Sequence, residues 1–234
     1  MVKEDIAAVK EEPLCKSYPG TKKMNKKLAI LGAGGHAKVI LDAALLMKQW
    51  DEIIFLDDSH NGNKEFMSYP LIGGIRQLGQ TVLPKEYDVV IAVGNNHIRA
   101  KLYDQAKKLG FHLPCIYHPS ASISRFTEIE EGSVFFAQTV VNAGSKIGKC
   151  TIVNTSASVD HDCLLGDFVH ISPGANLGGN TNVGDYSWIG IGSCTRHGID
   201  IGSQCMIGAG AVVVKNIPDS TTVVGNPAQV LEKA

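Results

Sequence analysis

The sequence predicts a two-part fold, in which a small Rossmann-like parallel α/β sheet precedes a parallel β-helix built from hexapeptide repeats. Three observations lead to it. Residues 26–118 alternate apolar strands with helical patterns, residues 119–215 repeat every six positions, and the chain has 25 glycines but only 6% aromatic residues. Two shorter segments flank these parts. We expect residues 1–25 to be a polar, flexible extension and residues 216–234 to be a C-terminal tail.

The composition is that of a globular protein without a strong electrostatic footprint. The 234 residues are 44% hydrophobic, and 22 Lys+Arg oppose 23 Asp+Glu. This balance argues against nucleic-acid or membrane partners. No apolar run approaches the ~20 residues that span a bilayer, and we find no secretory signal, so we expect a cytoplasmic protein. The six cysteines form no C-x-x-C pair, which favours reduced thiols over a disulfide or zinc framework.

The first part of the chain has the strand–helix alternation of a parallel sheet. The expected elements are a strand at 27–31, a helix at 36–47, strands at 53–56 and 88–93, and a helix at 97–109 that Gly110 ends. Alternation of this kind predicts a small parallel α/β sheet.

A glycine-rich turn follows the first strand. Backbone N–H groups of Gly34, Gly35 and His36 at the start of the next helix would attract phosphate. The segment GAGGHA lacks the third glycine of the dinucleotide fingerprint, so this motif alone leaves a dinucleotide oxidoreductase half-domain open. Asp57 and Asp58 end the second strand. Their carboxylates suit hydrogen bonds from a base or ribose, although a helix cap would explain them too.

The second part has a period of six residues. Every sixth residue from Ile123 to Val213 is apolar in fifteen of sixteen cases, and the exception is Thr195. The residue four positions later is small in thirteen of fifteen cases. Large side chains pointing into a prism with small residues at its corners explain this pattern, which predicts about five coils of 18 residues. We expect Pro218 to end the coils and residues 225–228 to form a turn.

Four motifs together resemble one family. They are GAGGHAKV (32–39), FLDD (55–58), VGNNHIR (93–99) and NTSASVDHDC (154–163) within the hexapeptide run. With them, residues 26–232 resemble the PglD/NeuD-type sugar acyltransferases. The resemblance implies a left-handed β-helix, a homotrimer and acetyl-CoA as co-substrate. It also implies N-acetylation of the 4-amino group of a nucleotide-linked 4-amino-4,6-dideoxy sugar. We expect UDP as the nucleotide, and the sequence leaves GDP open. O-acetylation of sialic acid or another sugar hydroxyl is the alternative.

His161 is the predicted general base. An amine that attacks a thioester must lose a proton, and imidazole accepts one near neutral pH. Asp162 would raise its basicity, although the family commonly has the longer Glu at this position. Cys163 fills a small inward slot of its repeat, which argues for a structural thiol and for direct transfer without an acyl-enzyme.

The resemblance implies further binding residues. Those expected to contact acetyl-CoA are His170, Gly179 through its backbone N–H, Ile191 and Ala209. Those expected to bind the sugar nucleotide are Gly34, Gly35 and His36 at the diphosphate, Asp57 and Asp58 at the nucleoside, Gly94 beside them, and Asn154 near the acceptor amine. We also expect His161 and His170 to be solvent-exposed in a single chain.

Two other functions are weighed against transfer. A zinc carbonic anhydrase on this fold needs two histidines two coils apart and a third five residues later. His161 and His197 are 36 residues apart, but the third position is Gly202, so we expect no metal site. A non-catalytic scaffold that binds nucleotide sugars would not need His161, which is present.

Overall fold

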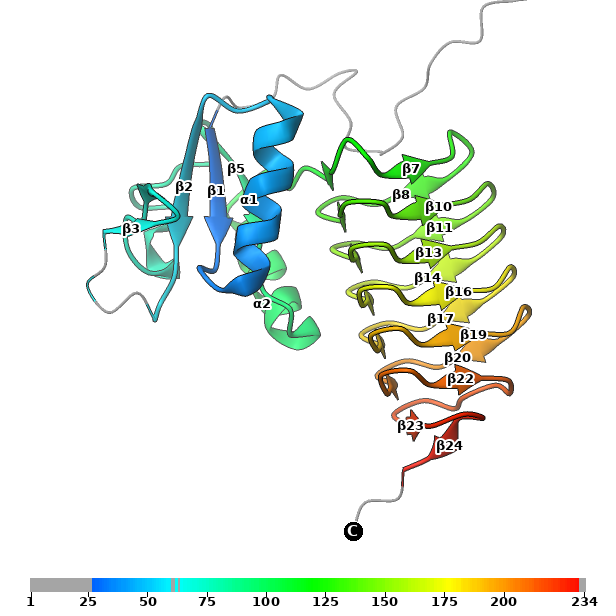
Figure 1. The fold of residues 1–234 in the computed structure, drawn as a ribbon. Coiled ribbons are helices and arrows are strands. Elements are labelled where there is room, and N and C mark those ends of the chain that lie inside the picture. The colour runs from blue at the N-terminus through cyan, green and yellow to red at the C-terminus, as the bar shows by residue number, and fades with distance from the viewer. Residues whose placement is uncertain (1–26, 60–61, 63, 232–234) are drawn as a thin grey trace, which may run out of the picture.

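The computed structural model describes residues 27–59, 62 and 64–231. An α/β part lies beside a column of stacked coils (Figure 1). Helix α1 covers one face of its small sheet and α2 covers the other. The predicted fold class is confirmed. The predicted extension at 1–25 lies outside the described residues.

The α/β part contains a three-stranded parallel sheet in the order β2-β1-β5. Its elements are β1 (Lys27–Leu31), α1 (Gly35–Met47), β2 (Glu52–Leu56), β5 (Tyr87–Ile91) and α2 (Asn96–Lys108). A hairpin of β3 (Glu65–Phe66) and β4 (Tyr69–Pro70) and the 3-10 helix η1 (Ile75–Gln77) follow β2. Each predicted strand and helix is present. In the part of the chain that the structure describes, no helix has the length and apolar character to cross a membrane.

The solenoid has three faces made of short strands that stack every 18 residues. Face one holds β7 (Ser122–Ile123), β10 (Val140–Val141), β13 (Ser158–Val159), β16 (Asn176–Leu177), β19 (Cys194–Thr195) and β22 (Val212–Val213). Face two holds β8 (Glu128–Ile129), β11 (Lys146–Ile147), β14 (Leu164–Leu165), β17 (Asn182–Val183) and β20 (Asp200–Ile201). Face three holds β6 (Ile116–Tyr117), β9 (Val134–Phe135), β12 (Ile152–Val153), β15 (His170–Ile171), β18 (Trp188–Ile189), β21 (Met206–Ile207), β23 (Thr222–Val224) and β24 (Gln229–Val230).

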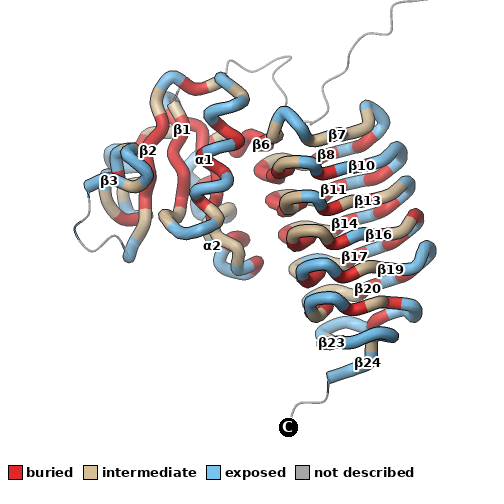
Figure 2. The backbone as a smooth tube through the Cα atoms, viewed as in Figure 1, coloured by how far each residue is buried: buried red, intermediate tan, exposed pale blue. Residues whose placement is uncertain are grey.

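The period of six arises because one face and one corner together take six residues. The second residue of each short strand points inward, so Val159 pairs with Leu177 one coil on and both side chains are buried. The buried rows run down the column (Figure 2). We name the corners by the faces they join: corner 1–2 (for example 160–163), corner 2–3 (166–169) and corner 3–1 (172–175).

The coils continue further than predicted. β23 pairs in parallel with β21, so the ladder extends past Pro218, and our prediction that this proline ends the coils is wrong. Asn216 and Asp219 carry the chain through this corner, because their side chains accept the N–H groups of Asp200 and Ser203. The predicted turn at 225–228 is present, and β24 then covers the last strand in antiparallel pairing.

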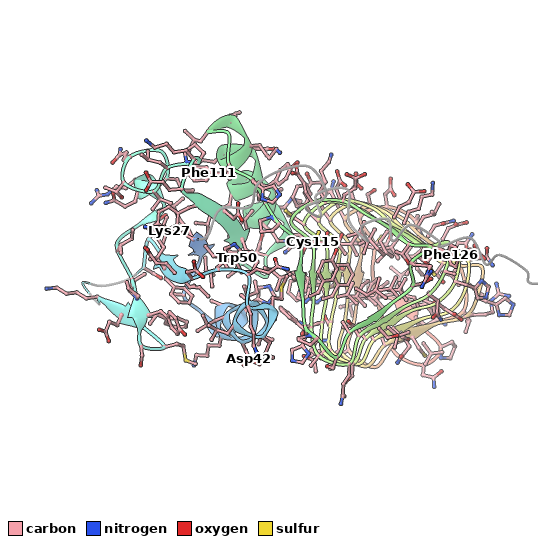
Figure 3. The ribbon with its side chains drawn as sticks, turned by 90° about the horizontal axis from the view of Figure 1, so that it is seen from above. Lys27, Asp42, Trp50, Phe111, Cys115 and Phe126 are labelled. Carbon is pink, nitrogen blue, oxygen red and sulfur yellow. The ribbon has the colours of Figure 1, made fainter. Side chains whose placement is uncertain are left out.

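The α/β part packs on face three and corner 2–3. One core cluster joins Ile40 and Ala44 of α1 to Val134 and Ile152 of the coils. A second group of contacts is aromatic: Tyr103 of α2 meets Phe168 edge-on with 5.6 Å between ring centroids. These contacts leave corner 1–2 far from the α/β part. Figure 3 views the molecule down the column, and Phe126 at corner 1–2 lies at the end opposite Lys27, Asp42 and Trp50.

A buried arginine joins the two parts. The Arg99 side chain is 1% exposed and donates to the carbonyls of Cys150 at 2.8 Å and Phe168 at 2.7 Å, both at corner 2–3. It also donates to the Val93 and Gly94 carbonyls of its own domain. Burial lowers its pKa to about 10, so the guanidinium is charged at neutral pH. One side chain therefore ties the end of β5 to two successive coils.

We predict that Arg99→Met lowers the free energy of unfolding by about 3 kcal/mol, because several buried carbonyls lose their donor. Chemical denaturation monitored by circular dichroism measures this. The exposed Arg76→Met is the matched control and should change stability by less than about 0.5 kcal/mol. Equal stability of the two variants would contradict the assigned role of Arg99.

Candidate active site

His161 lies on corner 1–2, between β13 and β14, with its side chain 56% exposed. It shares this corner with Phe126, because successive coils are joined there by hydrogen bonds. Gly144 N–H donates to the Phe126 carbonyl, and Asp162 N–H donates to the Ala143 carbonyl. The predicted base therefore stands at the end of the prism that Figure 3 shows opposite the α/β part.

Two carboxylates flank His161. Asp162 Oδ2 lies 2.9 Å from His161 Nδ1, so the shorter aspartate reaches the imidazole directly. Asp162 adopts φ 58°, a left-handed conformation that aspartate tolerates. Asp160 Oδ1 accepts the His161 N–H and the Asn142 side-chain amide, each at 2.8 Å. The hydrogen bond that His161 makes to the Asp162 carboxylate raises the pKa of His161, and the charge of Asp160 raises it further.

Gly179 lies directly beneath the imidazole, one coil further along. A Cβ atom added there would stand 2.5 Å from His161 Nε2, so any other residue would displace the ring. Because Nδ1 faces Asp162, Nε2 is the ring nitrogen left for proton transfer. The Gly179 N–H also helps to lower the pKa of Asp160, after the larger contributions of Asn142 and the His161 N–H. That this N–H binds the thioester oxygen stays a prediction from the resemblance.

Cys163 points into the prism, as predicted. The residue is fully buried, and its Sγ lies 3.4 Å from the Gly178 carbonyl. Burial raises the pKa of its thiol. A protonated thiol without solvent access is a poor nucleophile, so Cys163 is not suited to carry the acyl group.

His170 lies on β15 and is 5% exposed, so our expectation that it is solvent-exposed in one chain is wrong. The α/β part covers it. Its ring centroid lies 4.2 Å from that of Trp188 and 6.3 Å from that of His36 at the start of α1. Asn154 Nδ2 lies 3.3 Å from His170 Nε2. We call His36, Asn154, His170 and Trp188 the junction cluster. Gly94 borders it, since a Cβ there would lie 3.8 Å from the Trp188 ring.

Both histidines of the junction cluster are neutral. Burial lowers the pKa of His170 to about 3 and that of His36 to about 4, and the nearby charge of Arg99 lowers both further. His36 Nε2 and His170 Nδ1 are buried and have no hydrogen-bond partner within the described chain. Each is a ring nitrogen ready for a polar group from elsewhere.

The start of α1 is open to solvent. Gly34 is its N-cap without a side-chain cap, and its first turn carries no acidic residue. A Cβ atom added at Gly34 or Gly35 would meet no atom within 4 Å. Asp57 Oδ2 accepts the Ala33 N–H at 2.6 Å, and Asp58 Oδ1 accepts the Ile75 N–H at 2.8 Å. The capping explanation thus applies to Asp58 at η1, while Asp57 ties β2 to the glycine turn.

Ile191 and Ala209 stack on corner 3–1. The Gly210 N–H donates to the Ile191 carbonyl, which places the two residues on successive coils. Ile191 is 61% exposed. Together they form an exposed apolar strip, separated from His161 by face one.

The predicted site residues thus fall into separate places on one chain. His161, Asp162 and Gly179 lie together, and so do His36, Gly94, Asn154 and His170 beside the junction. The prism stands between the two groups. Sequence reasoning missed Asp160, Asn142, Arg99 and Trp188. The acidic residue on each side of His161, and the arginine of VGNNHIR, were available signals.

Among residues 27–59, 62 and 64–231, no three His, Cys, Asp or Glu side chains could share a metal ion.

The prism and the exposed histidine–carboxylate pair define a hexapeptide-repeat acyltransferase. Residues 27–106 match the family model described as the PglD N-terminal domain. The GDP-perosamine N-acetyltransferase of Escherichia coli O157:H7 is 30% identical over 188 residues, which cover 78% of this chain and 83% of the relative. This chain therefore belongs to the family of PglD-type sugar N-acetyltransferases.

Two solved structures extend the likeness. The acetyltransferase domain of PglB from Neisseria gonorrhoeae FA1090, in complex with acetyl coenzyme A, is 48% identical with a TM-score of 0.86. The match covers 89% of this chain and 100% of that one. PerB from Caulobacter crescentus, in complex with CoA and GDP-perosamine, is 33% identical with a TM-score of 0.81. The match covers 88% of this chain and 97% of that one.

The junction cluster predicts acid sensitivity. Below pH 6.5 the unfolded chain binds protons on His36 and His170 that the folded chain excludes, so stability falls as pH falls towards their folded pKa values. Between neutral pH and 5.5, the two histidines should cost about 2–3 kcal/mol. His170→Phe should remove about half of this loss, measured by chemical denaturation across the range. Trp188→Phe, which alters the same cluster without removing a titrating group, is the control. Equal pH slopes for His170→Phe and the wild type would contradict the prediction.

Proposed function

We propose that this protein transfers the acetyl group of acetyl-CoA to the 4-amino group of a nucleotide-linked 4-amino-4,6-dideoxy sugar, with UDP the expected nucleotide and the cytoplasm the expected compartment. The observation that carries the proposal is the exposed His161–Asp162 pair, whose imidazole lies against Gly179. The sequence around it is 48% identical to that of an acetyltransferase domain solved with acetyl-CoA. O-acetylation of a sugar hydroxyl is the alternative. The two reactions are distinguished by whether the accepted substrate carries a free amine.

His161 is the proposed general base. The amine nitrogen attacks the thioester carbonyl and forms a C–N bond, and the proton of the nitrogen passes to His161 Nε2. The C–S bond then breaks, and the CoA thiolate takes the proton from the His161 imidazolium and leaves as its thiol, which returns His161 to its neutral form. Asp162 holds Nδ1–H and stabilises the imidazolium that forms. The Gly179 N–H is the proposed donor to the oxyanion.

The binding residues are proposed to act from two sides. Acetyl-CoA would lie along the coils against His170, Gly179, Ile191 and Ala209. The sugar nucleotide would bind with its diphosphate at Gly34, Gly35 and His36, where the open N-terminus of α1 offers N–H groups. Asp57, Asp58 and Gly94 would border the nucleoside, and Asn154 the amine.

Within one chain, the prism separates His161 and Gly179 from the junction cluster and from the start of α1 (Figure 3). We therefore propose a homotrimer in which one chain contributes corner 1–2 and its neighbour contributes the α/β part and the junction cluster. A threefold arrangement makes three equal clefts of this kind.

The acceptor and the base are tested together. Thiol release from acetyl-CoA is measured with UDP- and GDP-linked 4-amino-4,6-dideoxy sugars, a 3-amino analogue, and free and activated sialic acid. We expect turnover with one 4-amino sugar nucleotide. His161→Ala should lower that turnover at least ~100-fold while acetyl-CoA binding changes little.

His197→Ala is the control for this assay, since His197 is an exposed histidine on the same corner, two coils on, and should stay active. Turnover with a sialic acid alone would move the reaction to a hydroxyl. If the wild type releases no thiol with any acceptor of the panel, the proposed acceptor class is refuted. Normal turnover of His161→Ala would refute the base.

Mixed oligomers test whether neighbouring chains share the site. Gly34→Asp keeps a good N-cap residue but places a carboxylate where the diphosphate should bind. Oligomers of Gly34→Asp alone, or of His161→Ala alone, should be inactive. Co-expressed and purified through two different tags, the mixed trimers should recover about a third of wild-type sites, because each has one position that pairs an intact base with a neighbour's intact nucleotide site. If mixed oligomers stay inactive while each variant folds, the site lies within one chain.

A further inference from the structure

Thr195 is the one polar member of the inward row, and the ladder breaks where it lies. Elsewhere on face one, the residue after each inward residue donates its N–H to the main-chain carbonyl one coil on. Asn142 donates to Val159, Asp160 to Leu177 and Arg196 to Val213. Gly178 differs, because its N–H donates to the Thr195 side-chain Oγ1 at 2.9 Å. Accordingly β16 and β19 pair at a single position.

The hydroxyl groups of Thr195 and Thr181 form a closed ring around Gly178. Thr181 Oγ1 donates to the Gly178 carbonyl at 2.6 Å, and the two threonine hydroxyls are 3.1 Å apart. Each hydroxyl has one proton. Since Thr181 gives its proton to Gly178, Thr195 must donate to Thr181 while accepting the Gly178 N–H. Both polar backbone groups of Gly178 are thereby held, in a chain of bonds that strengthen one another.

This ring determines the orientation of the peptide beneath the base. The Gly178 carbonyl and the Gly179 N–H belong to one planar peptide, so holding the oxygen also sets the direction of the N–H. That N–H acts on Asp160, and the Gly179 Cα supports the His161 ring with no room for a Cβ. A rotation of this peptide would move the support of both side chains.

We propose that Thr195 is a positioning residue for the reaction: through Thr181 and Gly178 it holds the Gly178–Gly179 peptide on which His161 rests. The proposal deepens the proposed function and rests on it for its kinetic consequence. A valine at this position would restore the apolar row that fifteen other repeats follow. A purely structural explanation therefore expects Thr195→Val to be harmless or stabilising.

The test compares Thr195→Val with Thr195→Ser, which keeps the hydroxyl. We expect Thr195→Val to lower kcat by about 10-fold with KM values for both substrates within about twofold, because the base is misplaced while both substrates still bind as before. Thr195→Ser should retain most of kcat. Thr139→Val is the matched control. It removes a buried hydroxyl that bonds the Phe136 carbonyl at another corner, and it should behave like the wild type.

A second readout needs no substrate. In ¹³C-histidine-labelled protein, the ring signals of His161, assigned through His161→Ala, should shift in Thr195→Val and keep their wild-type positions in Thr195→Ser and Thr139→Val. If the wild type fails to acetylate any acceptor, the proposed function fails and these signals still decide the positioning role. Unchanged ring signals and an unchanged kcat in folded Thr195→Val would overturn the proposal. If that variant does not fold, Thr195→Ala replaces it, with the same outcomes.

Discussion

The site depends on the rigid attachment of the α/β part to the coils through Arg99. Its guanidinium is buried, and its acceptors are backbone carbonyls that belong to both parts, together with the Asn96 side chain. A carbonyl in a paired strand or corner cannot follow a moving partner as a flexible carboxylate could. Hinge motion of the α/β part against the prism would expose or break these bonds. Domain closure within one chain is therefore strongly disfavoured, and the proposed nucleotide site at the start of α1 would have to meet the His161 of another copy.

The same arginine separates two kinds of histidine. His36 and His170 are buried and lie near its charge, and both effects lower their pKa values so that the rings are neutral. His161 has the opposite surroundings. It is exposed and lies between two carboxylates that raise its pKa. A general base needs a nitrogen that gains a proton readily, whereas a residue that orients a ligand needs constant charge. The burial and the surrounding charges of the three histidines therefore fit the roles proposed for them.

Much of the fold could be predicted because the hexapeptide signal is local. Once the period sets which residues face inward, Cys163 must be buried and His161 must lie on the outside, as observed. The burial of His170 could not be predicted in this way. It depends on which face the α/β part covers, and that choice is made by long-range contacts such as Arg99 with Phe168. The capping role of Asp58 was open for the same reason, since its partner Ile75 lies 17 residues away.

The 18-residue repeat also explains why a single exception to the pattern carries information. In a stacked coil, each residue rests on the residue 18 positions on, so an exposed corner is controlled by inward positions of the next coil. His161 rests on Gly179, and Gly178 is held by Thr195. An aliphatic residue would satisfy the core at 195 as it does in every other repeat. A hydroxyl there costs apolar burial, and the bond it forms lies directly under the base. Packing of the prism therefore favours an aliphatic residue at 195, whereas the proposed positioning of His161 requires the hydroxyl.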